Sequence, residues 1–139
     1  MAERIFRKMS EKSGRSDISL LSASLIDMKG APADPKAAEL LAEKGFAGDG
    51  HKSRLLTEEM AAETDMILVM EQQHRDTIIE KYPDAAGKIF LLKPFYSSCT
   101  QPDSNYSHDI SDPYKKSGYH YRLCFAEIYM AIEGLLKCI

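Results

Sequence analysis

The first twelve residues alternate apolar and charged positions with the period of a helix. Met1, Ile5 and Met9 fall on one face, and Phe6 lies beside them. The pattern predicts an amphipathic helix that starts at the first residue, without the Ser, Thr, Asp or Asn that usually caps a helix. We interpret its charged face as a solvated surface. That face carries Glu3, Arg4, Arg7, Lys8, Glu11 and Lys12.

The following part of the chain predicts one strand and two helices. Residues 17–24, DISLLSAS, form a short run that is compatible with a β-strand. A helix is predicted from Pro35, with Asp34 as its N-cap and Gly45 just beyond its end. A second, shorter helix follows Thr57, whose hydroxyl stands in the capping position.

Two nearly continuous apolar runs predict strands that are buried on both faces. They cover residues 65–71, DMILVME, and 87–95, GKIFLLKPF, with a helix predicted between them over 72–82. Residues 96–119 are rich in Ser, Pro, Asp and Tyr, and a connection of this length indicates a functional loop. A last helix is predicted over 120–138. Its buried face comprises Cys124, Ile128, Ala131, Ile132, Leu135 and Leu136.

Strands that alternate with helices predict an α/β fold of three layers, in which helices flank both faces of a parallel sheet. The chain has 139 residues, 44% of them hydrophobic, which suffices for one core. We therefore expect a single domain over residues 1–139. Sheets of this kind place a strand ahead of the first helix, whereas only three strands are visible here. We expect the first central strand to be missing.

Composition restricts the partners and the compartment. The 18 basic and 21 acidic residues give a net charge of −3. A chain of this charge has no positive field to attract nucleic acid or an anionic membrane, so we expect neither as a partner. No apolar run approaches the length that spans a bilayer, and the charged N-terminus does not resemble a signal peptide, so we expect a cytoplasmic protein. The cysteines number three, without a C-x-x-C pair, so we expect neither a disulfide framework nor a zinc site.

Six segments follow one another in the order and spacing of a known family: MAERIFRKMSEKSG, SAS…GAPADPKAAELLAEKG, GHKSRLLTEE, DMILVMEQQHRD, GKIFLLKPF and DISDPY. The chain resembles a low-molecular-weight protein tyrosine phosphatase. The resemblance implies two-step hydrolysis of a phosphate monoester, in a phosphotyrosine protein or a small aryl phosphate, without a cofactor. A cysteine thiolate attacks phosphorus, an arginine and loop amides bind the oxygens, and an aspartic acid protonates the leaving phenol.

The chain departs from this family at the nucleophile. The family's cysteine and arginine lie six positions apart, but none of Cys99, Cys124 and Cys138 is followed by arginine at that distance. The family's loop runs directly into Met-Ala-Glu, so Met1 coincides with an internal methionine and about fifteen residues of strand and loop are expected to be absent. We expect the truncated chain to be inactive. An open slot beside 65–71 is expected to impair folding or to cause self-association through the sheet edges.

The segment DISDPY carries the candidate general acid. The resemblance assigns this role to Asp112, and it assigns a wall of the substrate cleft to Tyr114. Without the resemblance, Asp-Pro-Tyr is an ordinary turn, because Asp favours the first turn position and Pro the second, and Tyr114 is a packed residue. Asp109 is a weaker candidate, which we interpret as a turn carboxylate.

Three other residues match positions that support the family's active-site loop. His51 and Glu71 match a histidine and a carboxylate that brace the loop, or they belong to a partly buried ion pair without a further role. Ser22 matches a serine whose hydroxyl bonds the loop, and without the loop we expect it to be idle. The remaining histidines lack the spacing of metal ligands, so we predict no metal site: His74, His108 and His120.

Four functional hypotheses remain. The first is a phosphatase whose nucleophile loop lies upstream of Met1, and the second is a pseudophosphatase whose cleft binds without turnover. The third is a non-functional fragment. Arsenate reduction on the same scaffold ranks below these, because it needs further redox cysteines near the third strand, and the segment DMILVMEQQHRD contains none.

Overall fold

Helices outnumber strands in the computed structural model, which describes residues 1–48, 50–101 and 107–139. The elements, in chain order, are α1 (Ala2–Lys12), α2 (Pro35–Glu43), α3 (Glu58–Glu63), β1 (Ile67–Val69), α4 (Gln72–Lys81), the 3₁₀ helix η1 (Pro83–Lys88), β2 (Ile89–Leu91), the 3₁₀ helix η2 (Lys93–Tyr96) and α5 (Gly118–Cys138). None of the described helices is long and apolar enough to cross a bilayer.

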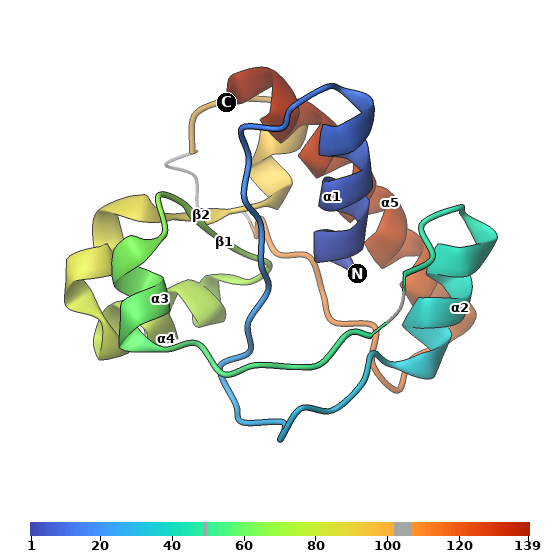
Figure 1. Cartoon of the computed structure of the whole chain (residues 1–139), viewed down its shortest axis with the longest axis horizontal. Helices are drawn as coiled ribbons and strands as arrows, with labels where there is room; N and C mark the ends of the chain where they lie inside the picture. Colours follow the sequence, from blue (N-terminus) through green and yellow to red (C-terminus); the bar gives the residue numbers. More distant parts are fainter. Residues whose placement is uncertain (49, 102–106) are drawn as a thin grey trace.

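Three layers make up the fold (Figure 1). Strands β1 and β2 pair in parallel, with Leu68 opposite Phe90. Helices α1 and α5 lie on one side of the strands and helices α3 and α4 on the other, while α2 packs on α5. The predicted α/β class, with helices on both faces of a parallel sheet, is confirmed.

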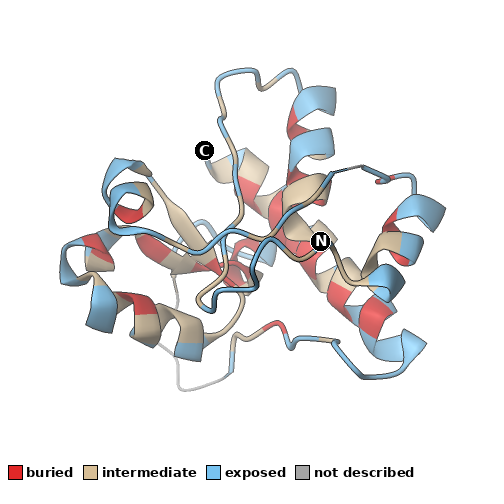
Figure 2. Ribbon diagram, turned by 60° about the horizontal axis from the view of Figure 1, so that its bottom comes forward, coloured by how far each residue is buried: buried red, intermediate tan, exposed pale blue. Residues whose placement is uncertain are grey.

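Each strand contributes side chains to two cores, because successive side chains of a strand point to opposite faces. Leu68 and Phe90 face the core formed with α1 and α5. Their neighbours face the core formed with α3 and α4: Ile67, Val69, Ile89 and Leu91. Figure 2 shows the buried residues on the helix sides that point inward. This explains why both strand segments read as continuous apolar runs.

The prediction of a strand over 17–24 is wrong, because the structure forms only an isolated bridge there, between Ser24 and Leu55. The Ser24 amide donates to the Arg54 carbonyl at 2.8 Å, and the Leu56 amide donates to the Ser24 carbonyl at 2.9 Å. Residues before Ser24 have no ladder partner in the described part of the chain. They run extended across α1, where Arg7 donates to the Leu20 carbonyl at 3.4 Å.

The two observed strands are shorter than predicted. Strand β2 is short because a 3₁₀ helix with a proline in its first turn flanks it on either side, and β1 extends only over the residues that pair with β2. Pro83 stands in the first turn of η1 and Pro94 in that of η2, where its fixed φ and missing amide proton are tolerated. The helix starts follow the predicted caps: Asp34 accepts from the Lys36 amide and Thr57 from the Met60 amide, both at 3.2 Å.

Helices η2 and α5 pack closely at Gly134. A Cβ atom built on Gly134 would lie 1.8 Å from the carbonyl oxygen of Phe95. Phe95 is buried, and the backbones of the two helices therefore touch without a side chain between them.

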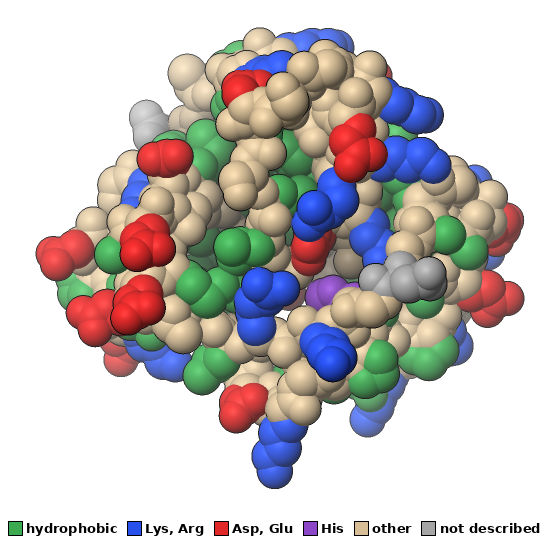
Figure 3. Space-filling model, viewed as in Figure 1, with side chains coloured by type: hydrophobic (Ala, Val, Ile, Leu, Met, Phe, Trp, Pro, Cys, Tyr) green, Lys and Arg blue, Asp and Glu red, His purple; other side chains and the backbone are tan. Residues whose placement is uncertain are grey.

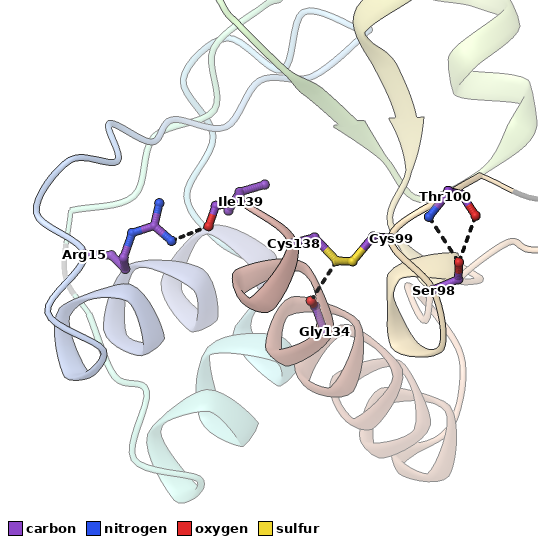
Figure 4. The surroundings of a disulfide bond; sticks show 7 residues. All are labelled: Arg15, Ser98, Cys99, Thr100, Gly134, Cys138 and Ile139. Carbon is purple, nitrogen blue, oxygen red and sulfur yellow. Dashed lines mark hydrogen bonds between the residues drawn. A yellow bond between two sulfur atoms is a disulfide. The ribbon is translucent and has the colours of Figure 1, made fainter.

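A disulfide links Cys99, three residues beyond η2, to Cys138 in the last turn of α5 (Figure 4). The expectation of no disulfide is wrong. The two cysteines are 39 residues apart in sequence, and it is the return of α5 to η2 that places their Cα atoms 5.5 Å apart. Next to this bond, the Arg15 guanidinium donates to the Ile139 carbonyl at 2.6 Å.

Removal of this disulfide is expected to lower the free energy of unfolding by about 2 to 4 kcal/mol, because the bond restricts the unfolded chain over a loop of this length. Urea unfolding of the double variant Cys99→Ser/Cys138→Ser measures the loss. As a matched control, the parent protein in dithiothreitol should unfold at the same midpoint as the double variant. An equal midpoint for the oxidised parent and the variant would contradict the prediction.

Candidate active site

The segment Asp112-Pro113-Tyr114 forms a turn on the protein surface. The Tyr114 amide donates to Asp112 Oδ1 at 2.9 Å, and the Lys116 amide donates to the Pro113 carbonyl at 2.9 Å. The first bond is that of an Asx turn, in which an aspartate side chain accepts from the amide two residues on. The second bond closes a separate turn over residues 113–116, so Pro113 stands first in it and not second as the sequence pattern predicts. The Asp112 carboxylate is exposed, so it is accessible to a ligand.

The negative charge of Asp112 contributes to the raised pKa values of two buried side chains of α5, Cys124 and Tyr121. Burial raises the pKa of the Cys124 thiol to about 11, and Glu127 and Asp112 act in the same direction against the positive Met1 amino group. A hydrogen bond to Asp34 raises the pKa of Tyr121 to about 12, again with a contribution from Asp112. Cys124 is therefore a protonated thiol at neutral pH, which is not the nucleophilic form.

Tyr114 projects from this turn and is not packed. Its side chain is 60% exposed, and the Lys115 ammonium lies 5.5 Å from the centre of its ring. An exposed ring next to a carboxylate can stack on an aromatic ligand. With more than half of the ring exposed, the alternative interpretation of Tyr114 as a packed residue is wrong.

Asp109 caps helix α4, which corrects its interpretation as a turn carboxylate. Its Oδ1 accepts from the amide of Gln72, the first residue of α4, at 2.8 Å. The next residue, Ile110, is 1% exposed and donates its amide to the Met70 carbonyl, just beyond β1, at 2.8 Å. Sequence alone missed this cap, because 37 residues separate the two partners.

Ser22 is not idle, in contrast to its expected state. Its hydroxyl donates to the Glu3 carboxylate, which also accepts from Arg7 at 2.9 Å. Burial opposes the ionisation of Glu3, but the hydrogen bonds from Ser22 and Arg7, with the charges of Arg7 and His51, outweigh it and lower the pKa of Glu3. These contacts tie the extended segment before Ser24 to α1.

His51 and Glu71 do not pair with each other. Glu71 Oε1 lies 3.9 Å from His74 Nε2, one turn along α4. His51 instead lies close enough to Glu3 to contribute to the low pKa of that carboxylate. The structure thus places His51 beside α1 and Glu71 at the end of β1.

Part of the charged face of α1 lines a groove, where the sequence indicated a solvated surface. The groove has a volume of about 480 Å³ and runs between α1 and residues 46–48 and 50–54. Figure 3 shows Lys and Arg side chains around this hollow, with a histidine beside it. The basic residues that line it are Arg4, Arg7, Lys8, His51, Lys52 and Arg54. In the described ranges, no three His, Cys, Asp or Glu side chains are arranged to bind a metal.

The parallel sheet between two helical layers places the chain among the three-layer α/β proteins. A family model described as low molecular weight phosphotyrosine protein phosphatase matches residues 1–139. The chain belongs to this family.

Individual relatives agree with the family assignment. The low molecular weight protein-tyrosine-phosphatase Wzb of Escherichia coli K12 is 31% identical over 117 residues, which are 84% of this chain and 71% of Wzb. A protein-arginine-phosphatase of Bacillus subtilis is 30% identical over 138 residues, which are 99% of this chain and 85% of the relative. The crystal structure of the T. tengcongensis low molecular weight protein tyrosine phosphatase superposes with a TM-score of 0.86 at 29% identity, covering 99% of this chain and 88% of that one.

Proposed function

We propose that this chain supplies the scaffold, the general acid and one cleft wall of a phosphotyrosine phosphatase. The observation that carries the proposal is the Asp112-Pro113-Tyr114 turn, which has an exposed carboxylate and an exposed ring and follows the Asp109–Ile110 anchor directly. In this proposal Asp112 protonates the leaving oxygen of the substrate. Ser22, His51 and Glu71 support the loop that carries the nucleophile.

The proposed substrate is phosphotyrosine in a protein, or a small aryl phosphate. The 60% exposed Tyr114 ring favours a flat aromatic group, because offset or edge-to-face ring contacts are favourable. The name of the Wzb relative supports this class. The B. subtilis relative is named for phosphoarginine, so that side chain is the alternative which the assay below should include.

We further propose that the 139 residues by themselves form no phosphocysteine. Cys99 and Cys138 are joined in a disulfide, and the Cys124 thiol is buried with its pKa raised to about 11. No cysteine of the chain has arginine six positions on. None of the three can therefore present a thiolate together with an arginine to one phosphate.

Phosphatase assays on two forms of the protein test both proposals. The 139 residues alone are expected to release no phenol from p-nitrophenyl phosphate above the buffer rate. The same residues, preceded by the strand and nucleophile loop of E. coli Wzb, are expected to turn over aryl phosphate and phosphotyrosine peptide. Turnover by the 139 residues, or a folded longer form that hydrolyses only phosphoarginine or nothing, would contradict the proposal.

Self-association through the sheet is proposed for the 139 residues. Among the described residues, β2 is the only strand that pairs with β1. The other edge of β2 is covered by Gln101, whose side-chain amide accepts from the Leu91 amide at 3.0 Å and donates to its carbonyl at 3.2 Å. An uncovered strand edge is a template for pairing with another chain. The preparations above should differ in sedimentation, with dimers or larger species only for the 139 residues.

We infer that residues 1–139 form one domain, because the core on the α1 side is continuous from Ile5 to Leu135. A cytoplasmic location is proposed because the sequence has no apolar run of spanning length and its charged N-terminus does not resemble a signal peptide. Since disulfides are rare in that compartment, this proposal predicts that the Cys99–Cys138 pair is reduced in the cell.

A further inference from the structure

The side chain of Lys93 connects η2 to α5 and to the segment that precedes the proposed acid. Its Nζ lies 2.7 Å from Glu127 Oε2 on α5. The same Nζ donates to the backbone carbonyl of Asp109 at 3.3 Å. Lys93 thus contacts two segments of the chain, at Asp109 and Glu127, that are 18 residues apart in the sequence.

Glu127 needs this lysine. Its side chain is 19% exposed, and its Oε2 is fully buried without an aligned hydrogen bond. The contact with Lys93 is therefore an ion pair between a buried oxygen and an ammonium whose side chain is 40% exposed. Removal of the ammonium would leave the buried oxygen without this partner, which is unfavourable, so the pair favours a Lys93 side chain directed toward α5.

The backbone of Lys93 is fixed independently of its side chain. It opens η2, whose Phe95 carbonyl touches Gly134 of α5 without room for a Cβ atom. The η2–α5 contact holds the backbone of Lys93, and Glu127 holds its ammonium. Lys93 therefore donates to the Asp109 carbonyl from a defined position.

The backbone at Asp109 and Ile110 is held by hydrogen bonds on both sides, and Asp112 follows soon after it. The Asp109 carboxylate binds the Gln72 amide, its carbonyl binds Lys93, and the Ile110 amide binds the Met70 carbonyl. Asp112 follows only two residues later, and its side chain accepts a local hydrogen bond from the Tyr114 amide. The location of the Asp112 carboxylate is therefore set by the anchor at 109–110.

We propose that Lys93 is a positioning residue for Asp112. By bridging Glu127 and the Asp109 carbonyl, it fixes the point from which the acid turn extends. The proposal rests on the proposed function in one respect only, the role of Asp112 as the acid. The anchoring itself can be measured without turnover.

Amide hydrogen exchange and ¹⁵N NMR of the 139-residue chain test the anchoring. Lys93→Met, which keeps the aliphatic stem and removes the ammonium, is expected to speed exchange at the Ile110 and Gln72 amides by about tenfold or more. The Tyr114 amide, which reports the hydrogen bond to Asp112, is expected to shift. Exchange at Ala61 in α3, which packs in the other core, should stay as in the parent protein.

Two variants separate positioning from general support. Lys93→Arg keeps the charge and is expected to restore slow exchange at Ile110. Lys88→Met is the matched control, because Lys88 also donates to a backbone carbonyl, that of Ala62, at 2.9 Å, but on the opposite layer. Unchanged exchange at Ile110 in Lys93→Met, equal effects in Lys88→Met, or no recovery in Lys93→Arg would overturn the proposal.

A double variant covers the case in which Lys93→Met does not fold because Glu127 is left unpaired. Lys93→Met/Glu127→Gln removes the buried charge together with its partner. It is expected to fold and still to exchange faster at Ile110 and Gln72. A folded double variant with parent-like exchange would overturn the positioning role. Failure of the phosphatase assay would instead overturn the role of Asp112 and leave these exchange results as they are.

Discussion

Asp112→Asn is expected to lower kcat for phenyl phosphate by about 10²- to 10⁴-fold in the longer form that carries a nucleophile loop. A positioned general acid contributes a factor of this size. Asparagine has nearly the same shape and can still accept the Tyr114 amide bond that now goes to Asp112 Oδ1. It has no proton to give to the leaving oxygen.

The leaving group provides an internal test of this role. p-Nitrophenolate leaves readily without a proton, whereas phenolate does not, so the loss should be smaller on p-nitrophenyl phosphate. Asp84→Asn is the matched control, because Asp84 is exposed on η1 in the opposite layer. A kcat for Asp112→Asn within twofold of the Asp84→Asn value on phenyl phosphate would show that Asp112 is not the acid.

Gly134→Ala is expected to destabilise the protein by about 3 kcal/mol or more, at the upper end of the range for overpacked sites. The new methyl group would lie 1.8 Å from the Phe95 carbonyl oxygen. Backbone cannot rotate away as a side chain can, so η2 and α5 must separate. Urea unfolding followed by far-UV circular dichroism measures the loss.

Gly87→Ala is the matched control for this substitution. Gly87 lies in η1, and a Cβ built on it meets no atom within 4 Å. Its effect should stay within about 0.5 kcal/mol, as for other surface substitutions. Equal midpoints for the two alanine variants would mean that η2 and α5 are not in backbone contact.

The hydrophobic pattern predicted much of the fold because it reports which face each residue buries. Even the rejected strand at 17–24 has the correct alternation, since Ile18 and Leu20 pack against the core while Leu21 is exposed. What the pattern cannot supply is a partner for the backbone, and without neighbouring amides and carbonyls an extended segment remains a coil. The same limit explains why the paired strands are shorter than their apolar runs.

The site was predictable only where one short segment carries it. Asp112 and Tyr114 lie in one short segment with a local turn signature, and the structure joins them by an Asx-type hydrogen bond, although the backbone turn begins one residue later than predicted, at Pro113. The Asp109 cap and the Lys93 bridge join residues 37 and 16 positions apart. Such contacts depend on the tertiary packing of β1, α4 and α5. A local sequence pattern carries no information about that packing.

The bond between Cys99 and Cys138 turns the last part of the chain into a covalent ring. This ring contains the acid turn and all of α5. A protease that cuts once inside the ring opens it but releases no fragment. The segment that carries Asp112 can therefore be nicked while both halves stay attached to the rest of the protein, until a reductant separates them.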